Sequence, residues 1–372
     1  MDKRIAAGIF LLLLTALALQ TVLSMRDKSA TFDEPAHALR GYYFFKTGNL
    51  MVYGHPPLMH FLTIPFLAFE QIRLPENHDE LYLKNHIHPL ADLTFFHLGN
   101  DADRMLFLAR LPVVILSVIL GIFVFRFAKE LYGTNAGLFA LFLYSFNPVV
   151  ISLSGMITTD IAAALFIFLS IYSYWTMLRK QTKSGIVVAG LMFGLAIGSK
   201  TVSVLLIPIF LVLGLAHHYE KRGKKENVSF GKLFFGFLAV LIIGYLIINS
   251  LYGFKGSFKS LSDNINDDPA EYVSKEKFSS SAISSMIVPW DGPVRSAARL
   301  LVEKAPIMLP YPFLKEIWST ANVANLAPTS FLLGENGTHF WYFMPVTLLV
   351  KLHLLILFSL FLSIFYFRKI KA

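Results

Sequence analysis

Long apolar stretches, separated by shorter polar segments, dominate the pattern of this chain. About 20 helical residues cross the roughly 30 Å of hydrocarbon in a bilayer. Apolar stretches that approach or reach this length lie at 5–24, 108–128, 136–153, 160–178, 185–199, 201–216, 233–252 and 342–367. This pattern predicts an all-α integral membrane protein with about eight transmembrane helices and with interfacial helices in the first outer segment, 25–107. The two shortest stretches, with Lys200 between them, fit either a tight hairpin or one interrupted region.

The composition agrees with a polytopic membrane protein. Hydrophobic residues make up 55% of the chain and charged residues only 15%, a balance that a soluble protein of 372 residues could not hide in one core. The chain has no cysteine, which excludes disulfides and thiolate metal sites. The net charge of +9 does not indicate nucleic acid as a partner, because the basic residues gather in short segments between apolar stretches.

These basic segments predict the orientation of the chain. If eight spans alternate, the basic segments all fall on one side, which should be the cytoplasmic side. They are Lys3/Arg4, Arg126/Lys129, Arg179/Lys180/Lys183, the 221–232 cluster and Arg368/Lys369/Lys371. We therefore expect a single membrane-embedded domain over 1–372 in the plasma or inner membrane, with both termini in the cytoplasm. Two long segments, 25–107 and 253–341, then face outward.

The N-terminus allows two interpretations. Lys3 and Arg4, the apolar run and the Ala16-Leu17-Ala18 sequence are similar to a cleavable signal peptide. The run continues through Val22 and reaches spanning length, which favours a retained anchor. Asp33 is outside in either case.

The first outer segment carries the strongest candidate for chemistry, Asp33-Glu34-Pro35-Ala36-His37. Asp33 before Glu34-Pro35 is also a good helix start, so the structural alternative is a cap on an amphipathic interfacial helix. A capping aspartate needs neither an adjacent glutamate nor a histidine on the same helical face. We therefore predict a functional role for Asp33 and Glu34, with His37 as a substrate-binding candidate.

Further candidates occur in the other segments on the same side. His55 begins a rigid His-Pro-Pro turn, although a lone histidine is as often structural or solvated. Asp160 opens the fourth predicted span, either as a member of the site or as a favourable charge at a helix start. The candidate cations for binding phosphate are Lys200, Arg104 and Arg110, with snorkelling to headgroups as the alternative for the two arginines.

Two ways of handling a phosphate group follow from these residues. Glu34, Asp160 and His55 form an alternative donor set for a divalent metal, with carboxylate oxygens and one imidazole. The basic residues could instead neutralise phosphate without a metal. The sequence indicates no certain cofactor.

The order of these motifs resembles the phospholipid carrier-dependent glycosyltransferases, the superfamily of protein O-mannosyltransferases and the lipid A aminoarabinose transferase. The similarity extends from about residue 1 to 360. The motifs that carry it are Asp33-Glu-Pro-x-His, Gly41-Tyr-Tyr, Lys46-Thr-Gly, His55-Pro-Pro-Leu, Arg104 to Gly133, Ser145-Phe-Asn-Pro, Thr158-Thr-Asp, Gly198-Ser-Lys-Thr, Gly334-Glu, and Trp341-Tyr-Phe-x-Pro with Lys351.

The resemblance implies the multi-span C-type glycosyltransferase architecture (GT-C) and a hexosyl or pentosyl transferase that uses a polyprenyl-phosphate sugar as donor. The acceptor would be a protein, a lipid or a polysaccharide at the outer face of the membrane. Asp33 matches the family's catalytic base, and Asp160 matches an acidic residue that serves the adjacent polar site. Single displacement by the acceptor would invert the anomeric centre. Many relatives continue into further spans, whereas this sequence ends soon after Arg368, which leaves acceptor recognition open.

Two other function classes stay open at this stage. A transporter or flippase of a lipid-linked sugar would normally place ionisable groups near the bilayer midplane and show paired repeats, neither of which the sequence indicates. A non-catalytic membrane scaffold is the other alternative. A soluble nucleotide sugar is a poor candidate for the donor, because no glycine-rich phosphate-binding loop is evident.

Overall fold

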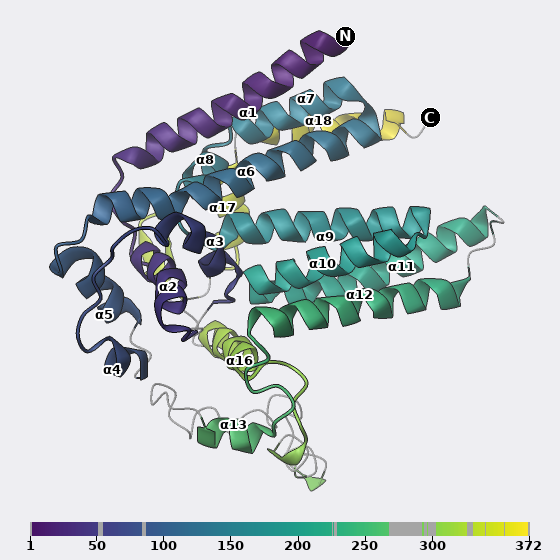
Figure 1. Cartoon of the computed structure of the whole chain (residues 1–372). Coiled ribbons are helices and arrows are strands. Elements are labelled where there is room, and N and C mark those ends of the chain that lie inside the picture. The colour runs from purple at the N-terminus through teal and green to yellow at the C-terminus, as the bar shows by residue number, and fades with distance from the viewer. Residues whose placement is uncertain are drawn as a thin grey trace. The chain divides into compact units, whose positions relative to one another are not determined.

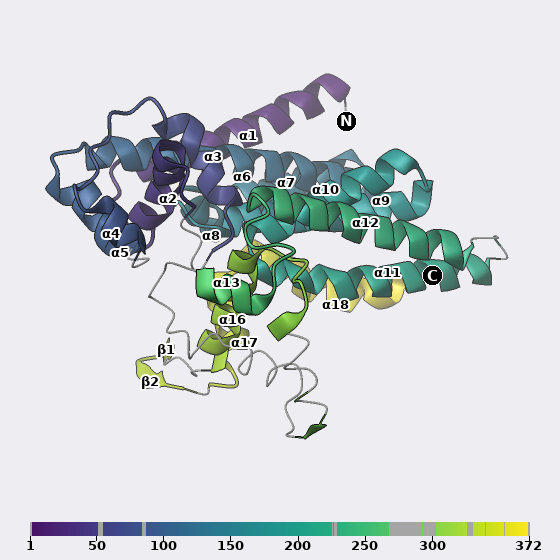
Figure 2. The same cartoon turned by 60° about the horizontal axis from the view of Figure 1, so that its bottom comes forward.

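The computed structural model describes most of the chain, and nearly all of what it describes is helical (Figure 1). The described residues are 2–50, 55–83, 87–224, 226, 229–267, 292–293, 296, 303–325, 330–338, 340–352 and 354–370. Most of 268–302, within the predicted second outer segment, lies outside them. The only sheet in the described part is a hairpin of β1 (Ser330–Leu332) and β2 (Glu335–Gly337), which is labelled in Figure 2.

Each of the eight predicted spans corresponds to helix in the structure. Five helical segments are long and apolar enough to cross a membrane, namely α1 (Lys3–Arg26), α6 (Ala102–Tyr132), α9 (Asp160–Lys180), η2 (Thr201–Leu205) with α11 (Leu206–Gly223), and α12 (Phe230–Leu251). Two bent pairs pass the same test together, α7 (Thr134–Ser145) with α8 (Pro148–Ser154) and α17 (Phe343–Lys351) with the first part of α18 (Leu354–Ile370). The described helices thus give five to seven candidate spans. The count of eight stays a prediction, because α10 (Lys183–Ser199) has only 17 residues.

The bend between α7 and α8 has a local cause. The two helices meet at 63°. The Asn147 side chain accepts a hydrogen bond from the amide N–H of Val149 at 2.9 Å, and Pro148 occupies the first turn of α8. A capping asparagine followed by proline starts a new helix rather than continuing the old one.

The chain forms two compact units. Unit 1 contains 1–28, 113–156 and 322–372, and unit 2 contains 29–112 and 157–321. In unit 1, α1 packs against α7 and α8, with Leu13, Leu14 and Leu141 buried between these elements. Unit 2 carries every candidate site residue predicted from the sequence.

Within unit 2, four apolar helices form a bundle. Helix α10 packs against α9 and α12, and α11 packs against the same two neighbours, as Figures 1 and 2 show. Aromatic side chains fill the interior, with the Tyr174 and Phe210 rings stacked at 4.1 Å. On α11, by contrast, Leu211 and Val212 are exposed, as expected of a helix whose outer face meets lipid.

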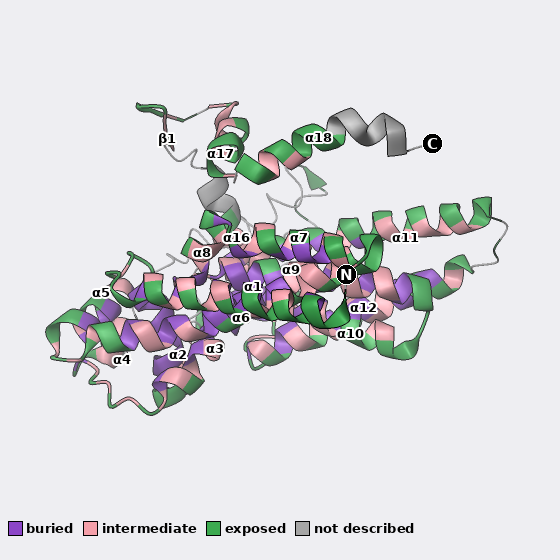
Figure 3. Cartoon of the chain, turned by 90° about the horizontal axis from the view of Figure 1, so that it is seen from above, coloured by how far each residue is buried: buried purple, intermediate pink, exposed green. Residues whose placement is uncertain are grey.

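The remainder of unit 2 precedes and follows this bundle. It includes α2 (Glu34–Thr47), α3 (Leu58–Leu67), α4 (His78–Leu83), α5 (Ile87–Asp92), η1 (Leu93–His97), α13 (Leu261–Asp267) and most of α16 (Tyr311–Asn325). Helix α2 packs against α3 and α5. The residues from Glu34 to Tyr43 are all buried, which is more enclosed than an amphipathic helix on a surface would be (Figure 3).

Glycines allow α10 and α12 to approach each other closely. A Cβ atom at Gly190 or Gly194 would lie only 2.5 Å from the Cβ atom of Ile243 or Ile247, respectively. The four-residue spacing places the glycines on one face of α10, where small residues let membrane helices come together. The contact therefore depends on the absence of a side chain.

We expect Gly194→Ala to lower the free energy of unfolding by about 1–3 kcal/mol, because the methyl group would overpack this contact. Gly8→Ala is the matched control, since a Cβ atom there would meet nothing within 4 Å. The control should be neutral or slightly stabilising, as alanine favours helix. Thermal unfolding in detergent measures both variants. Equal melting temperatures for the two would contradict the packing argument.

Candidate functional site

The two adjacent carboxylates of the first outer segment have different surroundings. Asp33 is the N-cap residue of α2 and is exposed, whereas Glu34 is the first residue of the helix and is completely buried. Successive residues on a helix point about 100° apart, so neighbouring side chains face different partners. The Asp33 side chain makes no capping hydrogen bond. The structural alternative of a capping aspartate therefore does not account for its carboxylate.

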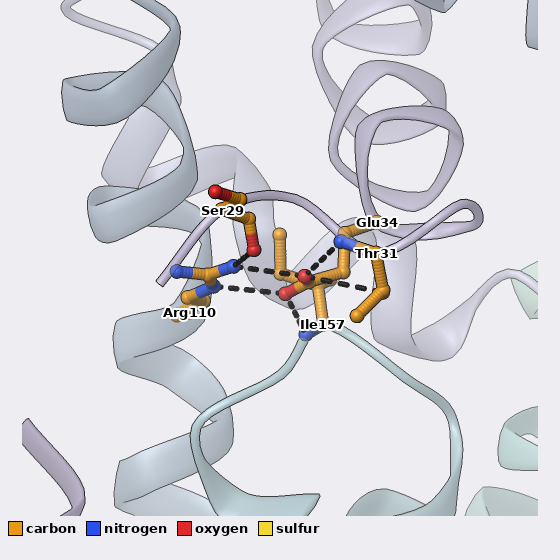
Figure 4. Close-up of polar contacts among 5 residues, drawn as sticks. All are labelled: Ser29, Thr31, Glu34, Arg110 and Ile157. Atoms are coloured by element: carbon orange, nitrogen blue, oxygen red, sulfur yellow. Dashed lines mark hydrogen bonds and ion pairs between the residues drawn. The ribbon is translucent and has the colours of Figure 1, made fainter. Parts of the chain in front are cut away.

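Glu34 forms a buried ion pair with Arg110, in the third turn of α6 (Figure 4). The Arg110 Nε and Nη2 atoms donate to the two carboxylate oxygens, each at 2.8 Å. The backbone N–H groups of Thr31 and Ile157 donate to the same carboxylate, each at 2.9 Å. Arg110 also donates to the carbonyl oxygen of Ser29 at 3.0 Å. One carboxylate thus joins the start of α2, the third turn of α6 and the segment before α9.

The ionised form of Glu34 is stabilised by these contacts. Burial alone would raise the pKa of the carboxyl, but the Arg110 hydrogen bonds and charge and the two backbone N–H donors lower the pKa below its ordinary value. Arg110 is 2% exposed, so its guanidinium is committed to the pair. The structure thus shows Glu34 and Arg110 holding each other and the neighbouring backbone, and their catalytic and phosphate-binding roles stay predictions.

A second ion pair joins Asp160 and Lys200, with the Lys200 Nζ atom 2.6 Å from the Asp160 Oδ1 atom. Asp160 is the first residue of α9, as the sequence predicted. Lys200 has extended backbone between α10 and η2, so the apolar stretch is interrupted there. Both side chains are about two-fifths exposed, at 40% and 39%. They therefore remain accessible to a ligand.

The charges of four side chains influence the pKa of His55. Arg40, Asp33, Lys200 and Asp160 all act electrostatically on its imidazole. We call these five residues the His55 site. Burial, together with the nearby Arg40, lowers the pKa of His55 to about 4, so the ring is neutral at physiological pH. The sequence-predicted carboxylates Asp33 and Asp160 thus lie within electrostatic range of one imidazole.

Arg40 was not predicted from the sequence. It is 5% exposed, and burial lowers its pKa to about 10 although Glu316 and Asp33 act to raise it. A spacing signal was present, since Asp33, His37 and Arg40 follow at intervals of four and three residues and so share a face of α2. A cation on the face that carries Asp33 is a candidate for binding an anion.

Two further histidines are buried beside the site. The Nδ1 atom of His37 lies 3.0 Å from the Nε2 atom of His60, and the His37 ring centroid is 4.7 Å from that of His55. Burial lowers the pKa values of His37 and His60 well below the ordinary value. Both rings are therefore neutral, and the substrate-binding role of His37 stays a prediction. His60 was not predicted from the sequence, because no motif around it distinguishes it.

Arg104, another predicted phosphate ligand, lies in a different environment. Its Nε and Nη2 atoms donate to the two oxygens of the Glu70 carboxylate, each at 3.0 Å. Arg104 is 62% exposed, and its printed ion pair is with Glu70 rather than with a residue of the His55 site. The geometry does not bring it into the His55 site.

The predicted metal donors do not form a metal site. In the described part of the chain, no three histidine, aspartate or glutamate side chains are grouped so that they could hold a metal ion. Both oxygens of Glu34 already accept hydrogen bonds from Arg110. The set of Glu34, Asp160 and His55 therefore does not fit a divalent cation.

The chain was compared with known proteins. Residues 95–250 match the family model described as dolichyl-phosphate-mannose-protein mannosyltransferase. No curated protein matches the chain. The family match confirms the resemblance to the carrier-dependent glycosyltransferases over this part of the chain. It supports a multi-pass membrane glycosyltransferase that uses a lipid-linked sugar donor.

Proposed function

We propose that the chain transfers a hexose or pentose from a polyprenyl-phosphate carrier to an acceptor hydroxyl or amine at the outer face of the cell membrane. The observation that carries the proposal is the accessible ion pair of Asp160 and Lys200, at 2.6 Å. The charges of Asp33 and Arg40 influence the pKa of His55 together with those of this pair. Two cations with two carboxylates suit a reaction in which a phosphate leaves and a proton is removed. The family match supplies the lipid-linked donor.

In the proposed reaction, Asp33 is the general base. The acceptor oxygen or nitrogen attacks the anomeric carbon while its proton passes to the Asp33 carboxylate. The bond from the anomeric carbon to the phosphate oxygen breaks, and the carrier phosphate leaves with the electron pair. This single displacement inverts the anomeric centre, because no second carboxylate is assigned as a nucleophile.

The cations of the site are proposed to stabilise the leaving phosphate. Arg40 is buried, so its charge interacts more strongly with an anion than a solvated charge would. Lys200 is held beside Asp160 and can donate to a second phosphate oxygen. Arg110 takes no direct part. With Glu34 it fixes Ile157, three residues before Asp160, and the start of α2, which carries Asp33.

The experiment that tests this function compares cells with and without the protein. We expect a polyprenyl-phosphate sugar to accumulate in cells that lack the protein, with loss of that sugar from a surface protein, lipid or polysaccharide. Mass spectrometry of membrane lipids and of surface polymers detects both changes. Unchanged lipids and polymers would contradict the proposed function. The mass of the accumulated lipid would identify the sugar and the carrier length.

A further inference from the structure

A groove between α1 and the last turns of α6 has no role in the reaction described above. Its volume is about 450 Å³, which is within the range of pockets that hold small molecules. The side chains that line it are Phe10, Ile122, Phe125, Arg126, Lys129 and Glu130. All six belong to unit 1, whereas the candidate site residues belong to unit 2. A ligand in this groove would therefore meet none of the side chains assigned to sugar transfer.

Contacts among three helices fix the apolar part of the groove. The ring centroids of Phe10 on α1 and Phe125 on α6 lie 4.7 Å apart. Both rings pack against a buried cluster on α1 and α7, which consists of Leu13, Leu14 and Leu141. Helix α7 also approaches the last turns of α6 closely, since a Cβ atom at Gly137 would lie 3.0 Å from the Cβ atom of Lys129. The groove is therefore built on packed helices.

Along one face of α6, the lining of the groove changes from apolar to basic. Ile122, Phe125 and Lys129 follow at intervals of three and four residues, so they share a face of the helix. Arg126 follows Ile122 by four residues, and Lys129 lies in the last turn of the helix. The helix rises about 10 Å from Ile122 to Lys129. A phospholipid presents the same order, an acyl chain followed by a phosphate group.

The charges of the groove suit an anion. The side chains of Arg126 and Lys129 are exposed. The Lys129 Nζ atom lies 5.5 Å from the centroid of the Phe125 ring, so the ammonium group marks the boundary between the apolar and the basic part. Glu130 adds one negative charge against these two positive charges. An arginine can bind a phosphate through two parallel hydrogen bonds, and a lysine adds a point charge. The lining therefore favours a ligand with a net negative charge.

We propose that this groove binds a phospholipid of net negative charge. Its phosphate group lies between Arg126 and Lys129, and one acyl chain follows Ile122 and Phe125. The sequence predicts that this end of α6 is cytoplasmic, and the cytoplasmic leaflet is the one that attracts basic segments through its anionic lipids. Free phosphate would use the two basic side chains but leave the apolar part of the groove unfilled. Snorkelling of the basic side chains to headgroups, the structural alternative, needs no groove.

The test is native mass spectrometry of the detergent-solubilised full chain. The protein is titrated with phosphatidylglycerol, or with phosphatidylcholine of the same acyl chains, whose headgroup has no net charge. The first phosphatidylglycerol should bind more tightly than the first phosphatidylcholine. Replacing both Arg126 and Lys129 with glutamine should weaken phosphatidylglycerol binding roughly 30-fold, since each basic side chain near an anionic lipid contributes about fivefold.

A second pair of basic residues provides the matched control. Lys180 ends α9 and Lys183 begins α10, and both side chains are exposed. They belong to another basic segment on the same predicted side of the membrane, and they do not line the groove. Replacing both with glutamine removes the same number of charges but should leave the affinity for phosphatidylglycerol unchanged. An equal loss from the two double variants would overturn the proposal, as would equal affinities for the two lipids.

Two further measurements test whether the ligand is a lipid. Ile122→Trp fills part of the apolar groove without changing a charge, so it should weaken phosphatidylglycerol binding. Ile115→Trp is its control, because Ile115 lies two turns earlier on α6, is 49% exposed and does not line the groove. Inorganic phosphate in excess should not displace the lipid. Wild-type affinity in Ile122→Trp, or displacement by inorganic phosphate, would overturn the proposal. Lipid binding needs no sugar transfer, so the result does not depend on the proposed function.

Discussion

Replacing Asp33 with asparagine should reduce kcat/KM for sugar transfer by about 10²–10⁴-fold, the usual contribution of a positioned general base. The amide keeps the size and the polar character of the carboxylate but cannot accept the acceptor's proton. Binding of a polyprenyl monophosphate should persist, because the cations of the His55 site are untouched. A radiolabelled donor lipid in proteoliposomes measures transfer, and equilibrium binding measures affinity.

The structure offers a close control for this variant. Asp92 is another exposed aspartate of the first outer segment, and its carboxylate lies 3.2 Å from the Nε2 atom of His97. Its contact is with His97 rather than with a residue of the His55 site, so Asp92→Asn should transfer sugar at the wild-type rate. An Asp33→Asn variant that kept more than about a tenth of the activity would exclude Asp33 as the base.

The sequence predicted the helices well, because hydropathy and length depend on local composition. The expected start of α9 at Asp160 and the interruption at Lys200 both appear in the structure. The bend between α7 and α8 was not predicted, although Asn147-Pro148 is a recognisable helix start. Periodicity of hydrophobic residues identifies a span, whereas capping chemistry decides where a span is broken.

For the candidate site, the sequence indicated which residues are candidates, but it did not indicate which side chains pair with each other. Asp33 and Asp160 were expected to lie close to each other, and both act on His55. Glu34 was grouped with Asp33 as catalytic, yet it is buried against Arg110, 76 positions along the chain. No local pattern reveals such a pairing.

The buried ion pair leads to the largest expected change in stability. Glu34→Gln should lower the free energy of unfolding by about 3–5 kcal/mol, because it leaves the Arg110 guanidinium buried without a counter-charge. Arg110→Gln should have a similar effect, because it leaves the Glu34 carboxylate buried without a counter-charge. Thermal unfolding of the purified protein in detergent measures both changes.

The pair of Arg104 and Glu70 provides the matched control, because it has the same bidentate geometry at 3.0 Å but an arginine that is 62% exposed. Arg104→Gln should cost much less stability than either buried variant, as solvent screens an exposed pair. A similar loss of stability from the buried and the exposed pair would show that burial does not determine the energetics of the Glu34 contact.

A double variant separates the stability of this pair from its influence on the site. Replacing Glu34 with leucine and Arg110 with methionine removes both buried charges, so much of the stability lost in the single variants should return. Sugar transfer by the double variant should nevertheless stay below the wild-type rate. The backbone N–H groups of Thr31 and Ile157 lose their shared acceptor, and these groups precede Asp33 and Asp160, respectively, by two and three residues. A stable double variant with wild-type activity would show that the position of the two aspartates does not depend on Glu34.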